Sequence, residues 1–464
     1  MFQLSPSRIA RYFFHECDRH LRYFATPRAE RKALGIPQPP YDASPVTAAI
    51  LEGGYVWETE VIGTHLKGRV RIARGKPDTE LRERAFDARQ TLRELQRLKP
   101  GEYLYQGTLL APQGFYAAFG LDPGLISFAP CRPDLIVRGM DEGDEPVYRV
   151  IDVKASDALK TSHKVQTALY SLLLHFALRE ADIPGRVDLG QAGIWLYSTG
   201  EPEWFDMGPV RSHVEAFLVR ELPRILTADL DELPWHLHYR CEWCEYFEHC
   251  RAQAEAAESV SLVPYMTPGA RRHLWALGVH TLDQFADLLE RRDAADLLAS
   301  CATLSGREER LRQAVAALRD GGVHTFGGAS LAMPRGESVR LLLTLQREPV
   351  SGRIYAAALL RTGNNHVFSG GTRHEEAFVA EDQGDCDRVR RDFVLRVHQI
   401  LTELDEYNDG LPWEEQKSLQ TYVFDSYEAT LLRELLVDAL RDPAVAREAL
   451  SLLFYFHSEE LVER

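Results

Sequence analysis

The stretch "VIDVKAS", residues 150–156, alternates like a β-strand but carries charged residues in an unusual place. Successive side chains of a strand point to opposite faces, so Ile151 and Val153 share one face and Asp152 and Lys154 share the other. Acidic and basic residues are depleted from strand interiors. A carboxylate and an ammonium group on one face of an apolar strand therefore require an explanation.

The neighbouring sequence predicts a hairpin around this stretch. Residues 133–139, "PDLIVRG", and residues 147–156, "VYRVIDVKAS", have the composition of strands. The linker "MDEGDEP" between them contains the Gly, Pro and acidic residues typical of a turn. The two segments are therefore expected to pair.

Such pairing would bring Asp134 close to Asp152 and Lys154. Two carboxylates at one buried place repel each other, and a divalent cation removes the repulsion. Oxygen ligands favour Mg²⁺ or Mn²⁺, which would polarise a phosphoryl oxygen and lower the pKa of a bound water. Lys154 would orient the water or stabilise charge on the phosphate. For Asp152 and Lys154 alone, a surface ion pair is the alternative.

A helix expected at residues 161–178 adds two polar side chains to this group. Gln166 and Tyr170 are four residues apart and therefore lie on one helical face. The rest of that helix is mostly apolar. Pointed at the end of the sheet, the two side chains would hold the nucleophile or a DNA phosphate.

Four of the seven cysteines have the spacing of a metal site. "CEWCEYFEHC" contains Cys241, Cys244 and Cys250, and Cys17 near the N-terminus is the natural fourth ligand. Four thiolates accept zinc or an iron–sulfur cluster. The spacing does not separate these two readings, and free thiols are a third.

Length and charge bound the class of protein. The 464 residues suffice for two or three domains, and the net charge of −15 argues against broad nonspecific DNA binding. The basic stretch "HLKGRVRIARGK", residues 65–76, has two interpretations. It is a solvated loop or edge strand, or it is a surface that contacts successive phosphates of a nucleic-acid backbone. There is neither an apolar run of the roughly 20 residues that a membrane span needs nor the order of a signal peptide. We expect a cytoplasmic protein without a membrane partner.

The order of predicted elements divides the chain into α/β regions separated by a helical one. Up to residue 262, helices and strands alternate as in a central sheet flanked by helices. Residues 265–290 predict two short helices joined around "LGVHT", with Gly269 and Gly278 as breaks. This pattern fits either a helix-hairpin-helix-like element or a plain helical linker. The Gly-rich residues 319–329 predict a boundary, after which a second α/β region begins. Single helices are expected at 4–25, 47–64 and 78–98, and a strand at 102–110.

The order Pro-Asp, Asp-x-Lys, Gln-x-x-x-Tyr resembles the PD-(D/E)XK nucleases, and specifically the RecB family. The resemblance implies a restriction-endonuclease-like mixed sheet and Mg²⁺- or Mn²⁺-dependent hydrolysis of single-stranded DNA or DNA ends. It implies that Asp134 and Asp152 bind the metal ion, that Lys154 assists the attacking water, and that Gln166 and Tyr170 position the substrate.

One element departs from the family pattern. RecB-family nucleases usually carry a metal-binding His on an earlier helix, in a Gly-x-x-x-His context. Here Gly53 is followed four positions later by Trp57, with Glu58 next. We expect Glu58 to supply the missing metal ligand; an exposed helix acid is the alternative.

The cysteine pattern resembles the iron–sulfur staple of AddB-type and CRISPR-adaptation-type RecB nucleases, with one cysteine before the nuclease core and three after it. The resemblance implies a structural [4Fe-4S] cluster held by Cys17, Cys241, Cys244 and Cys250. Closing a loop of more than two hundred residues would strongly restrict the unfolded chain.

The C-terminal region resembles the ribonuclease-H-like exonuclease domain that accompanies some RecB-type nucleases. An active version carries Asp-x-Glu on its first strand, whereas "LLLTLQRE" here has Thr344 and Gln346 at those positions. We expect a degenerate domain used for packing or DNA guidance. The predicted domains are 1–262 (nuclease with the four-cysteine cluster), 263–325 (helical) and 326–464 (ribonuclease-H-like).

The layout also implies a helicase as partner or fusion, in DNA repair or phage defence. No phosphate-binding G-x-x-x-x-G-K-[ST] motif occurs in the chain. The alternative function is a catalytically weak or inactive DNA-binding scaffold for a helicase.

Overall fold

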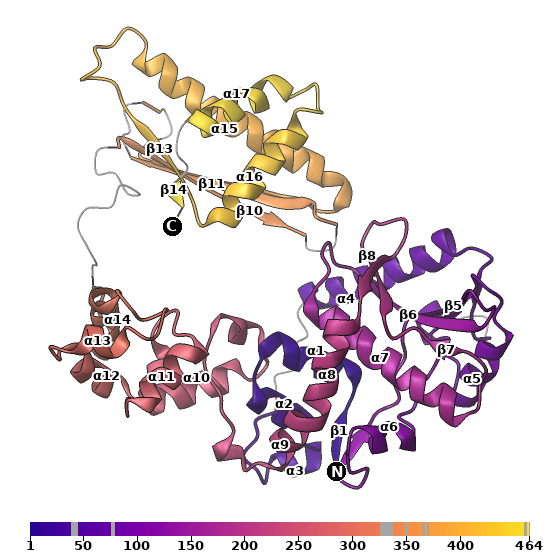
Figure 1. Cartoon of the computed structure of the whole chain (residues 1–464). Helices are drawn as coiled ribbons and strands as arrows, with labels where there is room; N and C mark the ends of the chain where they lie inside the picture. Colours follow the sequence, from indigo (N-terminus) through magenta and orange to yellow (C-terminus); the bar gives the residue numbers. More distant parts are fainter. Residues whose placement is uncertain are drawn as a thin grey trace. The chain divides into compact units, whose positions relative to one another are not determined.

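The structure, a computed structural model, separates into two compact units, Met1–Phe326 and Gly327–Arg464 (Figure 1). Both units are built from helices and mixed sheets, so the general α/β class is confirmed. The described residues are 1–38, 45–75, 79–324, 337–348, 351–363, 367–368, 371–458 and 462–463.

A seven-stranded mixed sheet organises the first unit. Along the sheet the strands follow the order β2-β3-β5-β6-β8-β9, and β7 pairs with β6. The central pair β5–β6 is an antiparallel hairpin, as predicted, and β8 runs parallel to β6. The strands are β2 (Val70–Arg71), β3 (Tyr103–Tyr105), β5 (Leu135–Met140), β6 (Pro146–Lys154), β7 (Arg186–Val187), β8 (Gln191–Leu196) and β9 (Glu203–Asp206). The strand expected at 102–110 is limited to β3.

The alternation of β6 places its apolar side chains in two separate clusters. Ile151 and Val153 pack with Trp57 from α4 (Pro45–Glu60) on one face. Val150 packs on the other face with Leu169 from α7 (Thr161–Glu180), which lies along the sheet in Figure 1. Burial on both faces fixes the register, because a slip of one residue would exchange the two sets.

The helices of the first unit differ from the expected bounds in several places. Besides α4 and α7, the α-helices up to residue 256 are α1 (Pro6–His15), α2 (Asp18–Ala25), α3 (Arg28–Arg31), α5 (Ala88–Arg97), α6 (Gln113–Ala118), α8 (Gly208–Ala216), α9 (Leu222–Thr227) and α10 (Phe247–Ala256). Two π-helical turns span Val61–His65 and Phe217–Glu221, and 3₁₀ turns span Leu81–Glu83, Leu230–Glu232, Tyr239–Trp243 and Val260–Leu262. A short parallel pair joins β1 (Phe2–Leu4) to β4 (Ile126–Phe128).

The single helix expected at 4–25 is wrong, because the chain breaks between α1 and α2. Glu16 adopts a left-handed conformation with φ of 53°, which ends α1, and the Cys17 side chain caps α2. Ser5 caps α1, since its hydroxyl accepts a hydrogen bond from Arg8 N at 3.2 Å. The helix expected at 78–98 begins only at residue 88, where Asp87 and Gln90 form a capping box. The helix expected at 161–178 is present as α7, which begins after Lys160 without a side-chain cap.

Four short helices with their own apolar cluster follow the cysteine segment within the first unit. They are α11 (Pro268–Ala276), α12 (Leu282–Leu289), α13 (Ala294–Leu298) and α14 (Glu308–Asp320). Gly278, with φ of 78°, separates α11 from α12, as expected. Gly269 lies in the first turn of α11, so its predicted role as a break is wrong.

A five-stranded sheet forms the second unit, in the order β12-β11-β10-β13-β14. The first three strands pair antiparallel, whereas β13 is parallel to β10 and β14 is parallel to β13. The helices of this unit share its apolar cluster with the sheet. The elements are β10 (Val339–Arg347), β11 (Ile354–Gly363), β12 (Arg373–Val379), a 3₁₀ turn (Gln383–Asp385), α15 (Cys386–Asn408), β13 (Leu419–Val423), α16 (Ser426–Ala439), α17 (Ala446–Ser458) and β14 (Val462–Glu463).

Among the helices that the structure describes, none has the length and apolar character needed to cross a membrane.

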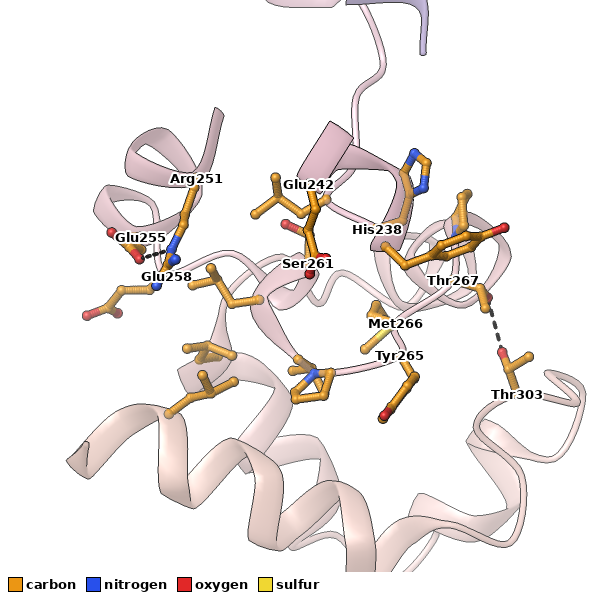
Figure 2. Close-up of a pocket in the computed structure, with 18 of the residues that line it drawn as sticks. His238, Glu242, Arg251, Glu255, Glu258, Ser261, Tyr265, Met266, Thr267 and Thr303 are labelled. Atoms are coloured by element: carbon orange, nitrogen blue, oxygen red, sulfur yellow. Dashed lines mark hydrogen bonds and ion pairs between the residues drawn. The ribbon is translucent and has the colours of Figure 1, made fainter. Parts of the chain in front are cut away.

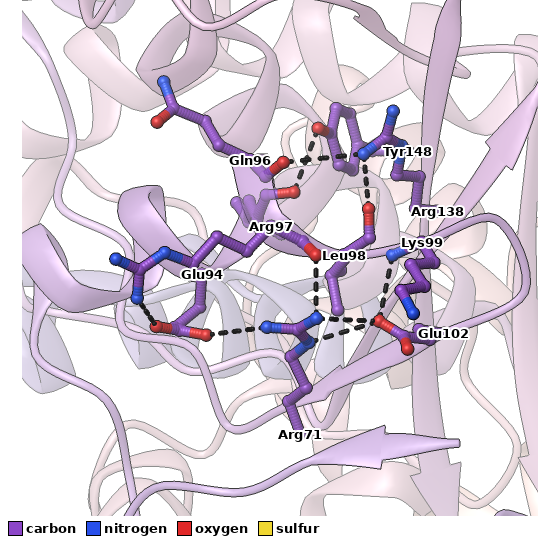
Figure 3. A network of polar contacts seen from close by, with 10 residues as sticks. Arg71, Glu94, Gln96, Arg97, Leu98, Lys99, Glu102, Arg138 and Tyr148 are labelled. Carbon is purple, nitrogen blue, oxygen red and sulfur yellow. Dashed lines mark hydrogen bonds and ion pairs between the residues drawn. The ribbon is translucent and has the colours of Figure 1, made fainter.

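Arg71, from the basic stretch at 65–76, is held in a network of polar contacts at the edge of the first sheet (Figure 3). Its guanidinium lies 3.2 Å from Glu94 and 3.0 Å from Glu102, and it donates to the carbonyl of Arg97 at 2.7 Å. These contacts join β2 to α5 and to the start of β3. Arg71 therefore has a structural role, which favours the edge-strand interpretation of this part of the basic stretch. Lys67 and Arg74 of the same stretch are exposed.

Replacing Arg71 with alanine is expected to destabilise the first unit by about 1 kcal/mol, since the ion pairs are partly exposed and one charged hydrogen bond to a carbonyl is lost. The midpoint of urea-induced unfolding measures the change. The variant Arg74→Ala removes an exposed arginine of the same stretch and serves as the control. Equal midpoints for the two variants would contradict a structural role for Arg71.

Candidate functional site

The β5–β6 hairpin brings the two predicted aspartates together. Leu135 pairs with Ile151, so Asp134, one residue earlier, lies opposite Asp152, one residue later. Asp134 Oδ2 also accepts a hydrogen bond from Val153 N at 2.7 Å, which ties it to β6. Asp152 is only 1% exposed. The register therefore places two carboxylates next to each other at the end of the hairpin.

Lys154 supplies the positive charge at this place. Its Nζ lies 2.6 Å from Asp152 Oδ2, and apart from this ion pair that oxygen has no hydrogen-bond partner among the described residues. Burial by itself would lower the pKa of Lys154, but Asp152, Asp134 and Glu58 raise it, and the net pKa lies above its usual value. The side chain as a whole is 24% exposed, so part of it is accessible to solvent.

One ammonium group does not neutralise the acidic groups. Burial, and then the Asp152 carboxylate, raise the pKa of Asp134 well above its usual value, and Glu58 raises it further. Asp134 therefore tends to keep a proton when no cation is present. A divalent cation with oxygen ligands would take the place of that proton, so Asp134 and Asp152 fit Mg²⁺ or Mn²⁺ by donor type and by charge.

Glu58 faces the same site from α4, whereas Trp57 does not. The Glu58 carboxylate lowers the tendency of Asp134 to ionise, and its Oε1 accepts a hydrogen bond from Gln106 Nε2 at 3.1 Å. Trp57 is 2% exposed and packs against Ile151, on the opposite face of β6 from Asp152. Among the described residues, Glu58, Asp134 and Asp152 do not gather as a group with all ligand atoms within 4.8 Å. Glu58 thus lies beside the aspartate pair and is held by Gln106.

Gln166 and Tyr170 contact each other on α7. Gln166 Nε2 donates to the Tyr170 hydroxyl at 3.0 Å, and Tyr170 is 6% exposed. Burial, and then the Asp152 and Asp134 carboxylates, raise the pKa of the Tyr170 hydroxyl, which therefore stays protonated. The Tyr170 hydroxyl is therefore close enough to Asp134 and Asp152 for their charges to affect its pKa.

The structure adds three residues to this site that the sequence did not indicate. Tyr105 and Gln106 lie beside Glu58: burial, and then Glu58, raise the pKa of Tyr105, while Gln106 has a φ of 46°, uncommon for a residue other than glycine. Burial, and then Lys154, lower the pKa of His163 on α7 to about 4. The pair Gln-Gly in "YLYQGTLL" was the available sequence signal, because it interrupts an apolar strand.

The four cysteines converge as their spacing indicated. Cys17, Cys241, Cys244 and Cys250 line one small pocket, together with His15 and His20. Burial raises the pKa of Cys17 and of Cys244 to about 12, so these thiols stay protonated without a metal. No three of the four sulfur atoms, all in described residues, lie within 4.8 Å of one another. A tetrahedral zinc site needs sulfur atoms about 3.8 Å apart, given Zn–S bonds of about 2.3 Å.

A larger pocket of about 1250 Å³ lies elsewhere in the first unit, between the cysteine segment and the short helices (Figure 2). Its charges are mixed and largely paired: Arg251 lies 2.8 Å from Glu255, and Arg319 lies 2.7 Å from Asp283. The described lining includes none of the aspartate, lysine, glutamine or tyrosine residues discussed above. This larger pocket is therefore distinct from the site formed by Asp134, Asp152 and Lys154.

In the second unit, the buried Glu428 carboxylate contacts the hydroxyl of Thr344, one of the two neutral residues noted in the stretch 341–348. Glu428 on α16 is 7% exposed and accepts hydrogen bonds from the Thr344 hydroxyl, from Leu345 N at 3.3 Å and from Phe424 N at 2.9 Å. The carboxylate is thus satisfied by a hydroxyl and two amides. This arrangement does not require a metal ion.

Comparison with known proteins assigns the chain to no family, since no protein-family model, curated protein or solved structure matches it.

Binding of Mg²⁺ or Mn²⁺ is expected to release a proton from Asp134. The pKa of this group is raised without the cation, and a bound cation would keep it ionised. Affinity should therefore fall as the pH falls through the raised pKa. Calorimetry in two buffers of different protonation enthalpy measures the released protons. Asp134→Asn should abolish the buffer dependence, and Asp144→Asn in the exposed hairpin turn should retain it; the same buffer dependence in both variants would contradict the assignment.

Proposed function

We propose that the first unit is a metal-dependent deoxyribonuclease that hydrolyses phosphodiester bonds in single-stranded DNA or at DNA ends. The observation that supports this proposal most is the meeting of Asp134 and Asp152 across β5 and β6, with Lys154 Nζ 2.6 Å from Asp152. The combination of two acids, a lysine and the Gln166–Tyr170 pair is the one that the resemblance to RecB-family nucleases implies. A restriction-endonuclease-like sheet belongs to the same proposal.

Each side chain has a chemical role in this proposal. Mg²⁺ or Mn²⁺, held by Asp134 and Asp152, would supply positive charge near the scissile phosphate and lower the pKa of the attacking water. Lys154 orients that water and stabilises negative charge that develops on the phosphate. The protonated Tyr170 hydroxyl and the Gln166 amide donate hydrogen bonds that position a DNA phosphate. Glu58, held by Gln106, strengthens the negative potential that attracts the cation.

We further propose that the four cysteines hold a structural [4Fe-4S] cluster. Four thiols around one pocket match the donor set, and their spacing is wider than a zinc tetrahedron requires. The cluster would connect the start of α2 to the segment leading into α10. Zinc is the alternative ion for this site.

The second unit is proposed to be a degenerate ribonuclease-H-like domain that packs or guides DNA. Its antiparallel strands followed by parallel strands, and the neutral Thr344 beside Glu428, support this assignment. A helicase as partner or fusion, a cytoplasmic location and a role in DNA repair or phage defence are parts of the proposal that follow from the resemblance.

A second candidate function is a DNA-binding scaffold with weak or absent catalysis. Trp57 occupies the position of the usual metal-binding His and is buried in an apolar cluster, which favours this candidate. Glu58 would then have no catalytic role.

The test compares cleavage of labelled single-stranded DNA by the full-length protein and by Lys154→Met, in Mg²⁺ and in Mn²⁺. We expect kcat to fall by at least about a hundredfold in the variant, because a charge that acts in the transition state is lost. Lys99→Met, at an exposed lysine outside the site, should keep the wild-type rate. Equal cleavage by Lys154→Met would contradict the assignment, and DNA binding without cleavage by the wild type would establish the scaffold.

The cluster is tested by iron and acid-labile sulfide in anaerobically purified protein. We expect both in the wild type, a loss of both in Cys244→Ser, and unchanged content in Cys301→Ser, whose cysteine lies outside the pocket. The thermal midpoint of Cys244→Ser should fall, since the cross-link between distant segments is lost. Stoichiometric zinc without iron in the wild type would contradict the cluster.

A further inference from the structure

His15 and His20, which line the cysteine pocket, converge with Glu245 into a second group of possible metal ligands. One ring nitrogen each from His15 and His20 and a carboxylate oxygen of Glu245 all lie within 4.8 Å of one another. Neither the aspartate site nor the cysteine site proposed above uses these side chains. The two histidines are 230 and 225 residues away from Glu245 in the chain, so their approach depends on the tertiary fold.

The break between α1 and α2 creates this arrangement. His15 is the last residue of α1, and the left-handed Glu16 turns the chain so that His20, in the first turns of α2, faces it. The two imidazole rings have centroids 4.5 Å apart. Because a left-handed residue other than glycine costs conformational energy, the break is maintained by the surrounding structure.

The hydrogen bonding of the three side chains is incomplete. His15 and His20 are 3% and 4% exposed, and the Nδ1 atom of each is buried without a hydrogen-bond partner among the described residues. His20 Nε2 lies 3.3 Å from Glu245 Oε2. Arg11 Nη1 donates to the other oxygen of Glu245 at 3.0 Å, which orients the carboxylate toward the histidines. A buried imidazole nitrogen without a partner is unfavourable, and an ion bound by that nitrogen would satisfy it.

We propose that His15, His20 and Glu245 bind a divalent first-row transition-metal ion, with Zn²⁺ as the expected ion. Two imidazoles and one carboxylate are a donor set that suits zinc and related ions. Mg²⁺ prefers oxygen ligands, so this site would not compete for the cation of the aspartate pair. Arg11 would not bind the ion itself; through its hydrogen bond it would orient the Glu245 carboxylate that does.

A bound ion would connect the α1–α2 junction to the residue that directly follows Cys244. It would therefore link the same two chain segments as the cysteine site, through harder ligands that do not depend on a reduced thiol. Because binding needs the folded arrangement, the ion would also stabilise the fold. This inference does not depend on nuclease activity, and its zinc measurements rest on the iron–sulfur assignment proposed for the cysteines.

The experiment uses the full-length protein, purified anaerobically, dialysed against chelator and then equilibrated with Zn²⁺. Elemental analysis should find one zinc per chain in addition to the metal of the cysteine site. His20→Gln and Glu245→Gln should each lose this zinc and keep the wild-type iron and sulfide content. Glu248→Gln, an exposed acid three residues further along, is the matched control and should keep both.

X-ray absorption at the zinc edge of the wild type gives a second result that needs no variant. Nitrogen and oxygen neighbours alone are expected around the zinc. Sulfur neighbours would place the ion in the cysteine pocket and overturn the proposal, as would zinc content in His20→Gln equal to that of the wild type. Absence of additional zinc in the wild type would overturn it as well.

Discussion

Two carboxylates at a buried place cannot both stay ionised without an additional positive charge, and the β5–β6 hairpin imposes this situation on Asp134 and Asp152. The apolar residues on both faces of β6 fix the register, so the aspartates cannot move apart without exposing the clusters around Ile151 or Val150. Lys154 supplies one positive charge, whereas burial and the Asp152 carboxylate still raise the pKa of Asp134. A divalent cation in place of the proton on Asp134 would complete the charge balance, and this is the basis of the proposed metal binding.

A second constraint concerns two chain segments, one before and one after the strands of the seven-stranded sheet, that lie together in the first unit. The junction between α1 and α2 meets the segment that leads into α10, where the four cysteines line one pocket and His15, His20 and Glu245 lie beside it. A segment close to the N-terminus and one more than two hundred residues later are thus joined by groups that bind metals well. Ordering such distant segments costs chain entropy, and the proposed metal ligation would offset that cost.

The sequence predicted the parts of this structure that depend on local pattern. Alternation and the turn "MDEGDEP" defined the hairpin, and from it the proximity of Asp134 to Asp152 followed. The i, i+4 spacing placed Gln166 against Tyr170, and the cysteine spacing indicated the convergence around one pocket.

Other features depend on contacts that no local pattern contains. The periodicity of residues 4–25 is continuous, so the left-handed Glu16 that divides it was not predictable from apolar spacing. Gln106 reaches Glu58 across 48 residues of chain, and Glu245 reaches His20 across 225. Only the tertiary fold brings these side chains together.

A crystal of the full-length protein grown with Mn²⁺ would test the central claim most directly, through anomalous scattering at the manganese edge. The account predicts a peak within coordination distance of both Asp134 and Asp152, beside the Lys154 ammonium. A crystal that holds Mn²⁺ elsewhere, with a direct hydrogen bond between the two carboxyl groups and no peak at this place, would contradict it.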